Sequence, residues 1–100
     1  MFMDVQFADD DLDRLETDPA FDMGLSPAIV KAYRRRMQGI RAAVDERDFY
    51  AMKSWHFEKL SGKRSHQRSI RLNDQYRLIV ELAGRGRDTY VRIISVEDYH

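Results

Sequence analysis

The sequence predicts a single α+β domain in which an N-terminal strand and two helices pack on a small antiparallel β-sheet. Its 100 residues, 43% of them hydrophobic, are enough chain for one core and too few for two. The first half carries apolar residues at helical spacing, and the last third is rich in β-branched residues between turn-forming segments. No linker or repeat separates these parts, so residues 1–100 are expected to form one unit.

The N-terminal residues predict a strand followed by a short helix. Residues 3–8 alternate apolar and polar side chains, as in a half-buried strand. Residues 9–16 begin with acidic side chains, which are favourable at a helix N-terminus, and place Leu12 and Leu15 three positions apart. This helix is expected to end before Pro19.

A longer helix is expected to begin at Ser26, an N-cap, with Pro27 in its first position. An apolar stripe follows at steps of three and four residues, formed by Ile29, Tyr33, Met37, Ile40 and Val44. The opposite side carries Arg34, Arg35, Gln38 and Arg41. Consecutive residues fan out around a helix, so the run Arg34–Arg36 favours a solvated face over a basic motif.

The middle of the chain is less regular. Residues 48–55 are ambiguous, and residues 59–67 predict a polar loop around Gly62. We expect Trp55 and Phe57 to belong to the core, although aromatic rings in a basic segment can also stack on nucleobases.

Three strands are predicted in the last third, at residues 69–72, 76–82 and 89–96, with turns at 73–75 and 84–88. The third is apolar on both faces, as a central strand would be. A three-residue loop in the first hairpin keeps its apolar side chains on one face and places Arg71 opposite Arg77. Like charges so placed repel, so the two guanidinium groups either splay into water, pair with carboxylates, or hold an anion between them.

The formal net charge of zero hides two unlike halves. Residues 1–50 hold seven Lys and Arg against eleven Asp and Glu, whereas residues 51–100 hold ten against six. The basic residues concentrate in 53–77, and the acidic residues in 9–22. This asymmetry is consistent either with an anionic partner for the second half or with charges that only cover solvated faces.

Composition excludes several classes of protein. The absence of cysteine excludes disulfides and thiolate metal sites, and no apolar run is long enough to cross a membrane, so a cytoplasmic protein without a membrane partner is expected. The three histidines lack the short spacing of metal-binding motifs, so neither a metal site nor a cofactor is predicted. The terminal residues Asp98, Tyr99 and His100 are either an inert tail or, with His56, a source of acid–base groups.

Three segments together resemble the HigB branch of the RelE/ParE toxin superfamily: Trp55–Arg64, Ser69–Leu78 and Glu97–His100. The resemblance is strong over residues 49–100 and extends to the whole chain in length and order of elements. It implies a bacterial type II toxin that cleaves mRNA in the ribosomal A site without a metal or other cofactor. The partners it implies are a cognate helix-turn-helix (HigA-like) antitoxin, the 70S ribosome and mRNA.

The same resemblance assigns roles to residues. Asp98 and His100 match the C-terminal catalytic residues, Tyr99 a base-stacking or positioning group, and His56 a second active-site histidine. Arg71 and Arg77 match the arginines of the sheet, with Arg77 the first choice for stabilising phosphate charge. The expected RNA-binding cations are Lys53, Lys59, Lys63, Arg64 and Arg68.

Two alternatives on the same fold stay open. One is a ParE-like inhibitor of DNA gyrase, which would not need the acid–base groups at the C-terminus. The other is an RNA-binding regulatory protein with weakened catalysis, because Ser61 stands where the family often has a lysine.

Overall fold

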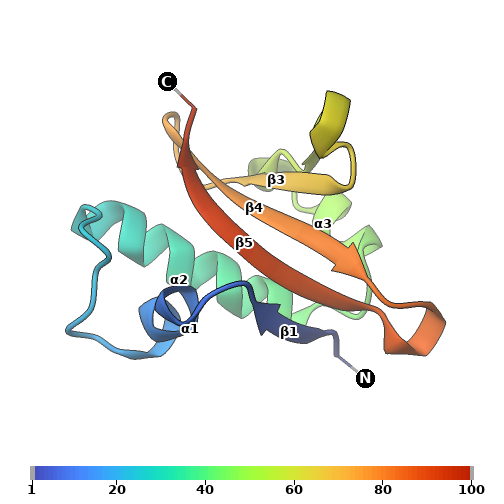
Figure 1. The fold of residues 1–100 in the computed structure, drawn as a ribbon, viewed down its shortest axis with the longest axis horizontal. Coiled ribbons are helices and arrows are strands. Elements are labelled where there is room, and N and C mark those ends of the chain that lie inside the picture. Colours follow the sequence, from blue (N-terminus) through green and yellow to red (C-terminus); the bar gives the residue numbers. More distant parts are fainter. Residues whose placement is uncertain (1, 100) are drawn as a thin grey trace.

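The computed structural model describes residues 2–99 as helices packed on one five-stranded sheet (Figure 1). The helices are α1 (Asp10–Thr17), α2 (Pro27–Ala42) and α3 (Arg47–Ala51), with 3-10 turns η1 (Lys53–Trp55), η2 (Gly62–Arg64) and η3 (Gly86–Asp88). The strands are β1 (Asp4–Phe7), β2 (Glu58–Lys59), β3 (Gln67–Arg71), β4 (Tyr76–Ala83) and β5 (Tyr90–Asp98). The α+β prediction is confirmed.

The sheet has the order β1-β5-β4-β3-β2. Strands β2 to β5 form antiparallel pairs, whereas β1 runs parallel to β5 at the edge, a pairing that the sequence pattern did not predict. The expectation that the last strand is internal is confirmed, since β5 lies between β1 and β4. The pairing of β4 with β5 shifts by one residue between Ile79 and Val80, which leaves Ile94 of β5 without a partner in the register, as in a β-bulge.

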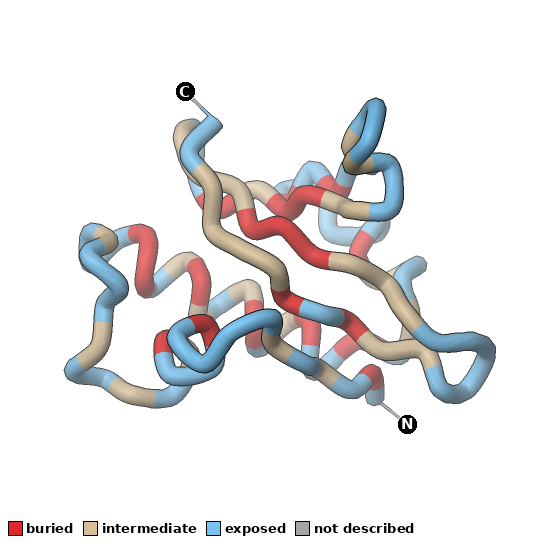
Figure 2. Tube along the Cα trace, in the orientation of Figure 1, coloured by how far each residue is buried: buried red, intermediate tan, exposed pale blue. Residues whose placement is uncertain are grey.

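The helices cover one face of the sheet, and the core lies between the two layers (Figure 2). Strand alternation sends Ile70, Leu78 and Val80 into this core. The other face, which we call the open face, carries the side chains that alternate with them: Ser69, Arg71, Arg77, Ile79, Ser95 and Glu97. Among residues 2–99 no α-helix covers this largely polar face, although Ile79 and Ser69 on it are buried.

The two N-terminal helices form where the sequence predicts them, and both begin with a side-chain cap. The Asp9 side chain accepts the Leu12 amide at the start of α1, and the Ser26 hydroxyl accepts the Ile29 amide at the start of α2. The buried Tyr33 hydroxyl of α2 donates to the Leu12 carbonyl at 2.7 Å and joins the two helices.

The structure corrects two expectations for α2. Helix α2 ends at Ala42, so Val44 lies beyond the apolar stripe and is 60% exposed. The arginine run does fan out, but only Arg35 is exposed to solvent, whereas Arg34 and Arg36 are half-buried. Arg34 donates to the carbonyls of Leu15 and Asp18, and Arg36 donates to the Arg71 carbonyl at 2.9 Å, because half-buried guanidinium groups satisfy backbone carbonyls that water does not reach.

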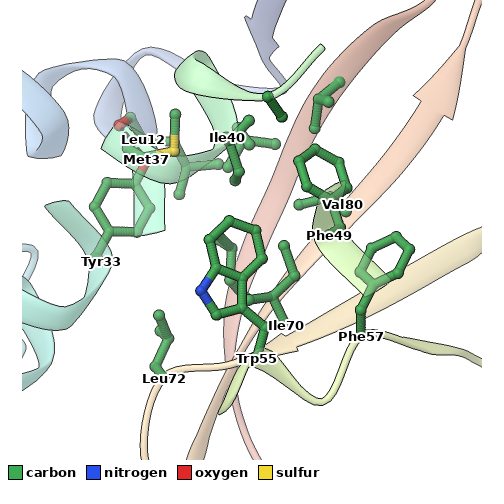
Figure 3. Close-up of a cluster of buried hydrophobic side chains, with 14 of the residues drawn as sticks. Leu12, Tyr33, Met37, Ile40, Phe49, Trp55, Phe57, Ile70, Leu72 and Val80 are labelled. Carbon is green, nitrogen blue, oxygen red and sulfur yellow. Dashed lines mark hydrogen bonds between the residues drawn. The ribbon is translucent and has the colours of Figure 1, made fainter. Parts of the chain in front are cut away.

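The segment after α2, whose secondary structure the sequence pattern did not predict, folds into α3 and η1. The 3-10 turn η1 places Trp55 in the core (Figure 3). Trp55 stacks on Phe49, and Phe57 meets Phe49 edge to face, so the core prediction for Trp55 and Phe57 is confirmed. Gly39 of α2 leaves the space that the Trp55 ring fills. The loop predicted at 59–67 is shorter than expected, because Lys59 pairs with Arg68 in β2 and Gln67 begins β3.

Candidate functional site

The open face holds a row of three charged residues near the β3–β4 turn. Arg71 pairs with Arg77 across β3 and β4, as the register argument predicted, and Arg77 pairs with Glu97 across β4 and β5. Three neighbouring strands therefore present two guanidinium groups and one carboxylate side by side.

Arg77 is held by neutral oxygen atoms. One of its terminal nitrogens donates to the His56 carbonyl at 2.7 Å and to the Oγ atom of buried Ser69 at 2.8 Å. The guanidinium carbon lies 5.9 Å from the centre of the Tyr99 ring, within the range of a cation–π contact. No Asp or Glu side chain among residues 2–99 forms an ion pair with Arg77, so in this part of the chain its positive charge is held in place by neutral oxygens.

Arg71 has a different partner. Its guanidinium group forms an ion pair with Asp74 in the β3–β4 turn, where the carboxylate is almost fully exposed. The two arginines thus relieve their repulsion by turning to different groups within the protein. An exposed ion pair of this kind is weak, so an incoming phosphate can compete for Arg71.

The β3–β4 turn also positions the C-terminal residues. The Gln75 carbonyl accepts the Tyr99 amide at 2.7 Å, and the Gln75 side chain donates to Asp98 at 3.1 Å. Asp98 pairs with Tyr76 in the sheet register, so strand alternation directs Asp98 away from the open face while Tyr99 lies beside Arg77. His100 lies outside the described residues.

His56 lies at the same end of the sheet. Its backbone has a left-handed conformation (φ 45°), which turns the chain from η1 toward β2 and points the His56 carbonyl at Arg77. The residue is exposed. The structure therefore brings His56, Arg71, Arg77 and Tyr99 to one end of the open face.

Arg64 reaches this face from the loop between β2 and β3. Its two terminal nitrogens donate to the two Glu97 oxygens at 2.9 and 2.7 Å, and its Nε atom donates to Gln67 at 2.8 Å. The Arg64 hydrogen bond lowers the pKa of Glu97 against the opposing effect of burial, with help from Ser95. The same hydrogen bond raises the pKa of Arg64, so both groups are charged and neutralise each other.

The other predicted RNA-binding cations lie on separate elements. Lys53 in η1, Lys59 in β2 and Lys63 in η2 are exposed. Arg68 pairs with Lys59 and Val80 in the register, so strand alternation directs it to the face of the helices. Its guanidinium group donates to the carbonyl of Ser65 in the adjoining loop and to that of Gln67 at the start of β3.

Three residues of this site were not among the predicted ones. Ser69 orients Arg77, Gln75 orients the C-terminal residues, and Glu97 binds Arg64. The period of two in β3 placed Ser69 beside Arg71, and this signal could have identified it. Nothing in the local pattern indicated that Glu97 would meet Arg64, which is 33 residues away.

Two properties of residues 2–99 bear on cofactors and membranes. No three His, Asp or Glu side chains in this range are grouped to hold a metal ion. No helix in it is long and apolar enough to cross a membrane.

Solved structures share this fold. A YoeB/ParE toxin from Agrobacterium tumefaciens is 15% identical with a TM-score of 0.63, over 98% of this chain and all of that one. The YoeB–YefM complex from Staphylococcus aureus contains a chain that is 18% identical with a TM-score of 0.61, over 100% of this chain and 99% of that one. At these identities the likeness establishes the fold. No curated protein matches the sequence.

A family model identifies the chain more specifically. The model that describes HigB, a RelE-like toxin of type II toxin–antitoxin systems, matches residues 5–100. This match takes in nearly the whole chain, including the strands and the C-terminal residues that form the site above. The protein is therefore a member of the HigB-like toxin family, the RelE-like toxins of type II toxin–antitoxin systems.

Proposed function

We propose that this toxin is an endoribonuclease that cleaves mRNA on the ribosome. The observation that carries the proposal is the fixed, unneutralised guanidinium of Arg77 beside the Tyr99 ring at the edge of the open face. A cation next to an exposed aromatic ring matches RNA, which offers a phosphate and a stacking base within one nucleotide.

Cleavage of RNA without a metal sets clear requirements. The 2′-hydroxyl attacks the adjacent phosphorus, a base removes its proton, and an acid protonates the departing 5′-oxygen. The negative charge that builds on the phosphate oxygens needs a preorganised cation. Arg77 is suited to the last role, because Ser69 and His56 hold it before substrate arrives.

The C-terminal residues are our candidates for the proton transfers. His100 is proposed as the principal acid–base group, since imidazole exchanges protons near neutral pH. Asp98, which Gln75 anchors, is proposed to orient this part of the chain, and Tyr99 to stack on a base. His56 is proposed as a second proton-transfer group, and Arg71 as a phosphate ligand that leaves Asp74 when RNA binds.

The proposed partners follow from this activity. The exposed lysines Lys53, Lys59 and Lys63 would contact phosphates of mRNA or ribosomal RNA, and the site of action would be the cytoplasm. Membership of a toxin–antitoxin family further supports a cognate antitoxin as protein partner, proposed to be HigA-like. The fold neighbour from S. aureus was itself solved as a toxin complex with YefM.

The test is induced expression in bacteria followed by mapping of mRNA 5′-ends. Wild-type protein should stop growth and produce cuts in phase with codons, whereas His100→Ala and Arg77→Ala should not. Arg85→Ala is the matched control, because Arg85 is an exposed arginine in the turn at the opposite end of β4. It should cleave as the wild type does.

Two outcomes would overturn the proposal. Growth arrest with intact mRNA and a DNA-damage response would indicate inhibition of gyrase instead. Cleavage that persists in His100→Ala would show that another group performs the proton transfer.

A further inference from the structure

Two side chains of the loop between β2 and β3 reach the open face: Arg64, which pairs with Glu97, and His66, whose Nε2 atom lies 3.4 Å from Glu81. This loop contains η2, which has no buried residue and projects from the β3 side of the sheet away from α1 and α2 (Figure 1). Its backbone hydrogen bonds at Arg64 and Ser65 are local, to Ser61 and Gly62. His66 and Ser65, whose carbonyl accepts from Arg68, hold the end of the loop next to β3, whereas within η2 itself only Arg64 is bound to the sheet by its side chain.

Arg64 is part of a continuous polar network across three strands. Glu97 in β5 accepts from Arg64 with both oxygens and from Ser95 at 2.7 Å. Gln67 in β3 accepts from Arg64 and donates to Glu81 in β4 at 3.1 Å. Every nitrogen of the Arg64 guanidinium group is thereby bound within the protein, in the bidentate geometry that makes arginine–carboxylate pairs specific.

We infer that Arg64 and Glu97 form a latch that positions the β2–β3 loop, and that Lys63 on this loop is thereby held in place to bind RNA phosphate. Lys63 is the neighbour of Arg64 in η2 and is exposed. This inference rests on the proposed RNA-cleaving function for the ligand, although the latch itself does not. Arg64 then acts as a positioning residue, in place of the direct RNA contact that its charge alone predicts.

Glu97 is correspondingly unsuited to act as the general base. Both of its oxygens are occupied by Arg64 and Ser95, so it would have to break the ion pair before it could accept a proton from a 2′-hydroxyl. A carboxylate in the middle of an RNA site also repels phosphate. The presence of Glu97 is explained if the free energy of RNA binding gained by positioning the loop exceeds the free energy lost through repulsion between Glu97 and phosphate.

This inference predicts the sign of a binding change. The Glu97→Gln variant removes a negative charge from the face, so simple electrostatics predicts tighter binding of RNA. Release of the loop predicts the opposite, a loss of affinity of roughly twofold to fivefold, because a partly exposed ion pair contributes up to about 1 kcal/mol. Asp74→Asn is the matched control, because it removes the same charge beside Arg71 without touching the loop. It should bind RNA more tightly or unchanged.

The probe is a bacterial ribosome programmed with an mRNA that carries a 2′-O-methyl group at the cleavage site, which permits binding but not cleavage. Affinity is measured for wild type, Glu97→Gln, Arg64→Gln, the double variant and Asp74→Asn. The double variant should bind no more weakly than either single variant, because the two residues act as one unit. With cleavable mRNA, Glu97→Gln should react from the saturated complex at a rate within about twofold of wild type, since a positioning residue changes binding rather than the chemical step.

Hydrogen exchange of the Arg64 and Ser65 amides tests the latch without RNA. Both amides should lose protection in Glu97→Gln and Arg64→Gln but keep it in Asp74→Asn. Unchanged protection, or tighter ribosome binding by Glu97→Gln, would overturn the inference, and a large fall in the saturated cleavage rate would assign Glu97 to the chemistry. If wild-type protein does not bind programmed ribosomes, both the proposed function and the role of the loop in RNA binding are contradicted. Hydrogen exchange still tests whether the Arg64–Glu97 pair positions the loop.

Discussion

Arg71 and Arg77 face each other across β3 and β4, yet their guanidinium groups bind different partners. Arg71 pairs with the exposed carboxylate of Asp74, whereas Arg77 donates to the neutral oxygens of Ser69 and His56. The two cations therefore differ in how much of their charge is available. Arg77 offers its full charge from a fixed position, and Arg71 must leave a carboxylate first.

This difference predicts that Arg77 and Arg71 contribute unequally to RNA cleavage. Arg77→Lys keeps the charge but cannot reproduce the planar donor geometry toward Ser69 and His56, so cleavage should fall about 10²-fold or more, as for loss of a transition-state donor. Arg71→Lys should lose less than about tenfold, because an exposed ion pair is worth little. Single-turnover cleavage on programmed ribosomes measures both, and equal losses would contradict the distinction.

The contact between Gly39 and Trp55 predicts an unusual cost for adding one methyl group. A Cβ atom at Gly39 would lie 2.5 Å from Cζ2 of Trp55. At an exposed position inside a helix, a Gly→Ala substitution raises the free energy of unfolding by up to about 1 kcal/mol. Here Gly39→Ala should lower the free energy of unfolding by about 1–3 kcal/mol, because the buried ring has to move.

Urea unfolding measures this change, and Trp55→Phe supplies the control. The smaller ring vacates the space, so Gly39→Ala should cost less in the Trp55→Phe background than in the wild type. An equal cost in both backgrounds would place the strain elsewhere.

The hydrogen bond from Tyr33 to the Leu12 carbonyl predicts a measurable link between α1 and α2. Tyr33 is fully buried, so Tyr33→Phe removes this bond where water cannot replace it. The free energy of unfolding should fall by about 0.5–1.5 kcal/mol. Tyr50→Phe is the matched control, since Tyr50 is exposed and should change stability little. Similar losses in the two variants would show that the Tyr33 hydroxyl has no special role.

The ion pair between Arg64 and Glu97 predicts a pH-dependent contribution to stability. The Arg64 hydrogen bond lowers the pKa of Glu97 below the ordinary value of 4.5, so the folded protein binds a proton at Glu97 less readily than the unfolded chain. The stabilisation is therefore complete above the ordinary pKa and is lost as the pH falls through the lowered one.

Thermal unfolding across this acidic range provides the measurement. Glu97→Gln and Arg64→Gln should each be less stable than wild type at neutral pH, and the difference should shrink below about pH 4.5. A difference that stays constant down to about pH 3 would show that the pair does not stabilise the ionised carboxylate.

Local patterns were sufficient for much of the fold. The acidic start of residues 9–16, the N-cap at Ser26 and the apolar stripe of α2 predicted both N-terminal helices, because charge at a helix end, capping and helical periodicity act between residues a few positions apart. The stripe was extended wrongly to Val44, since spacing alone does not show where a helix ends. The two-residue β2 was missed because so short a strand has no period of its own.

The sequence by itself determined which charges face each other in the hairpin. The need to keep Ile70 and Leu78 on one face sets the register, and the register places Arg71 opposite Arg77. The terminal residues Asp98 and Tyr99 were likewise identifiable as candidates, because the motif they belong to is contiguous in the chain.

Only the tertiary structure decided what each of these charges does. Arg64 meets Glu97, Arg77 meets the His56 carbonyl, and β1 joins the edge of β5 through contacts between residues far apart in the chain. Periodicity and composition describe neighbours in sequence, whereas a guanidinium group on a long side chain binds whatever acceptor the fold brings within its reach. For this reason the basic segment predicted a cationic surface, and the fold divided its arginines between the candidate site and contacts within the protein itself.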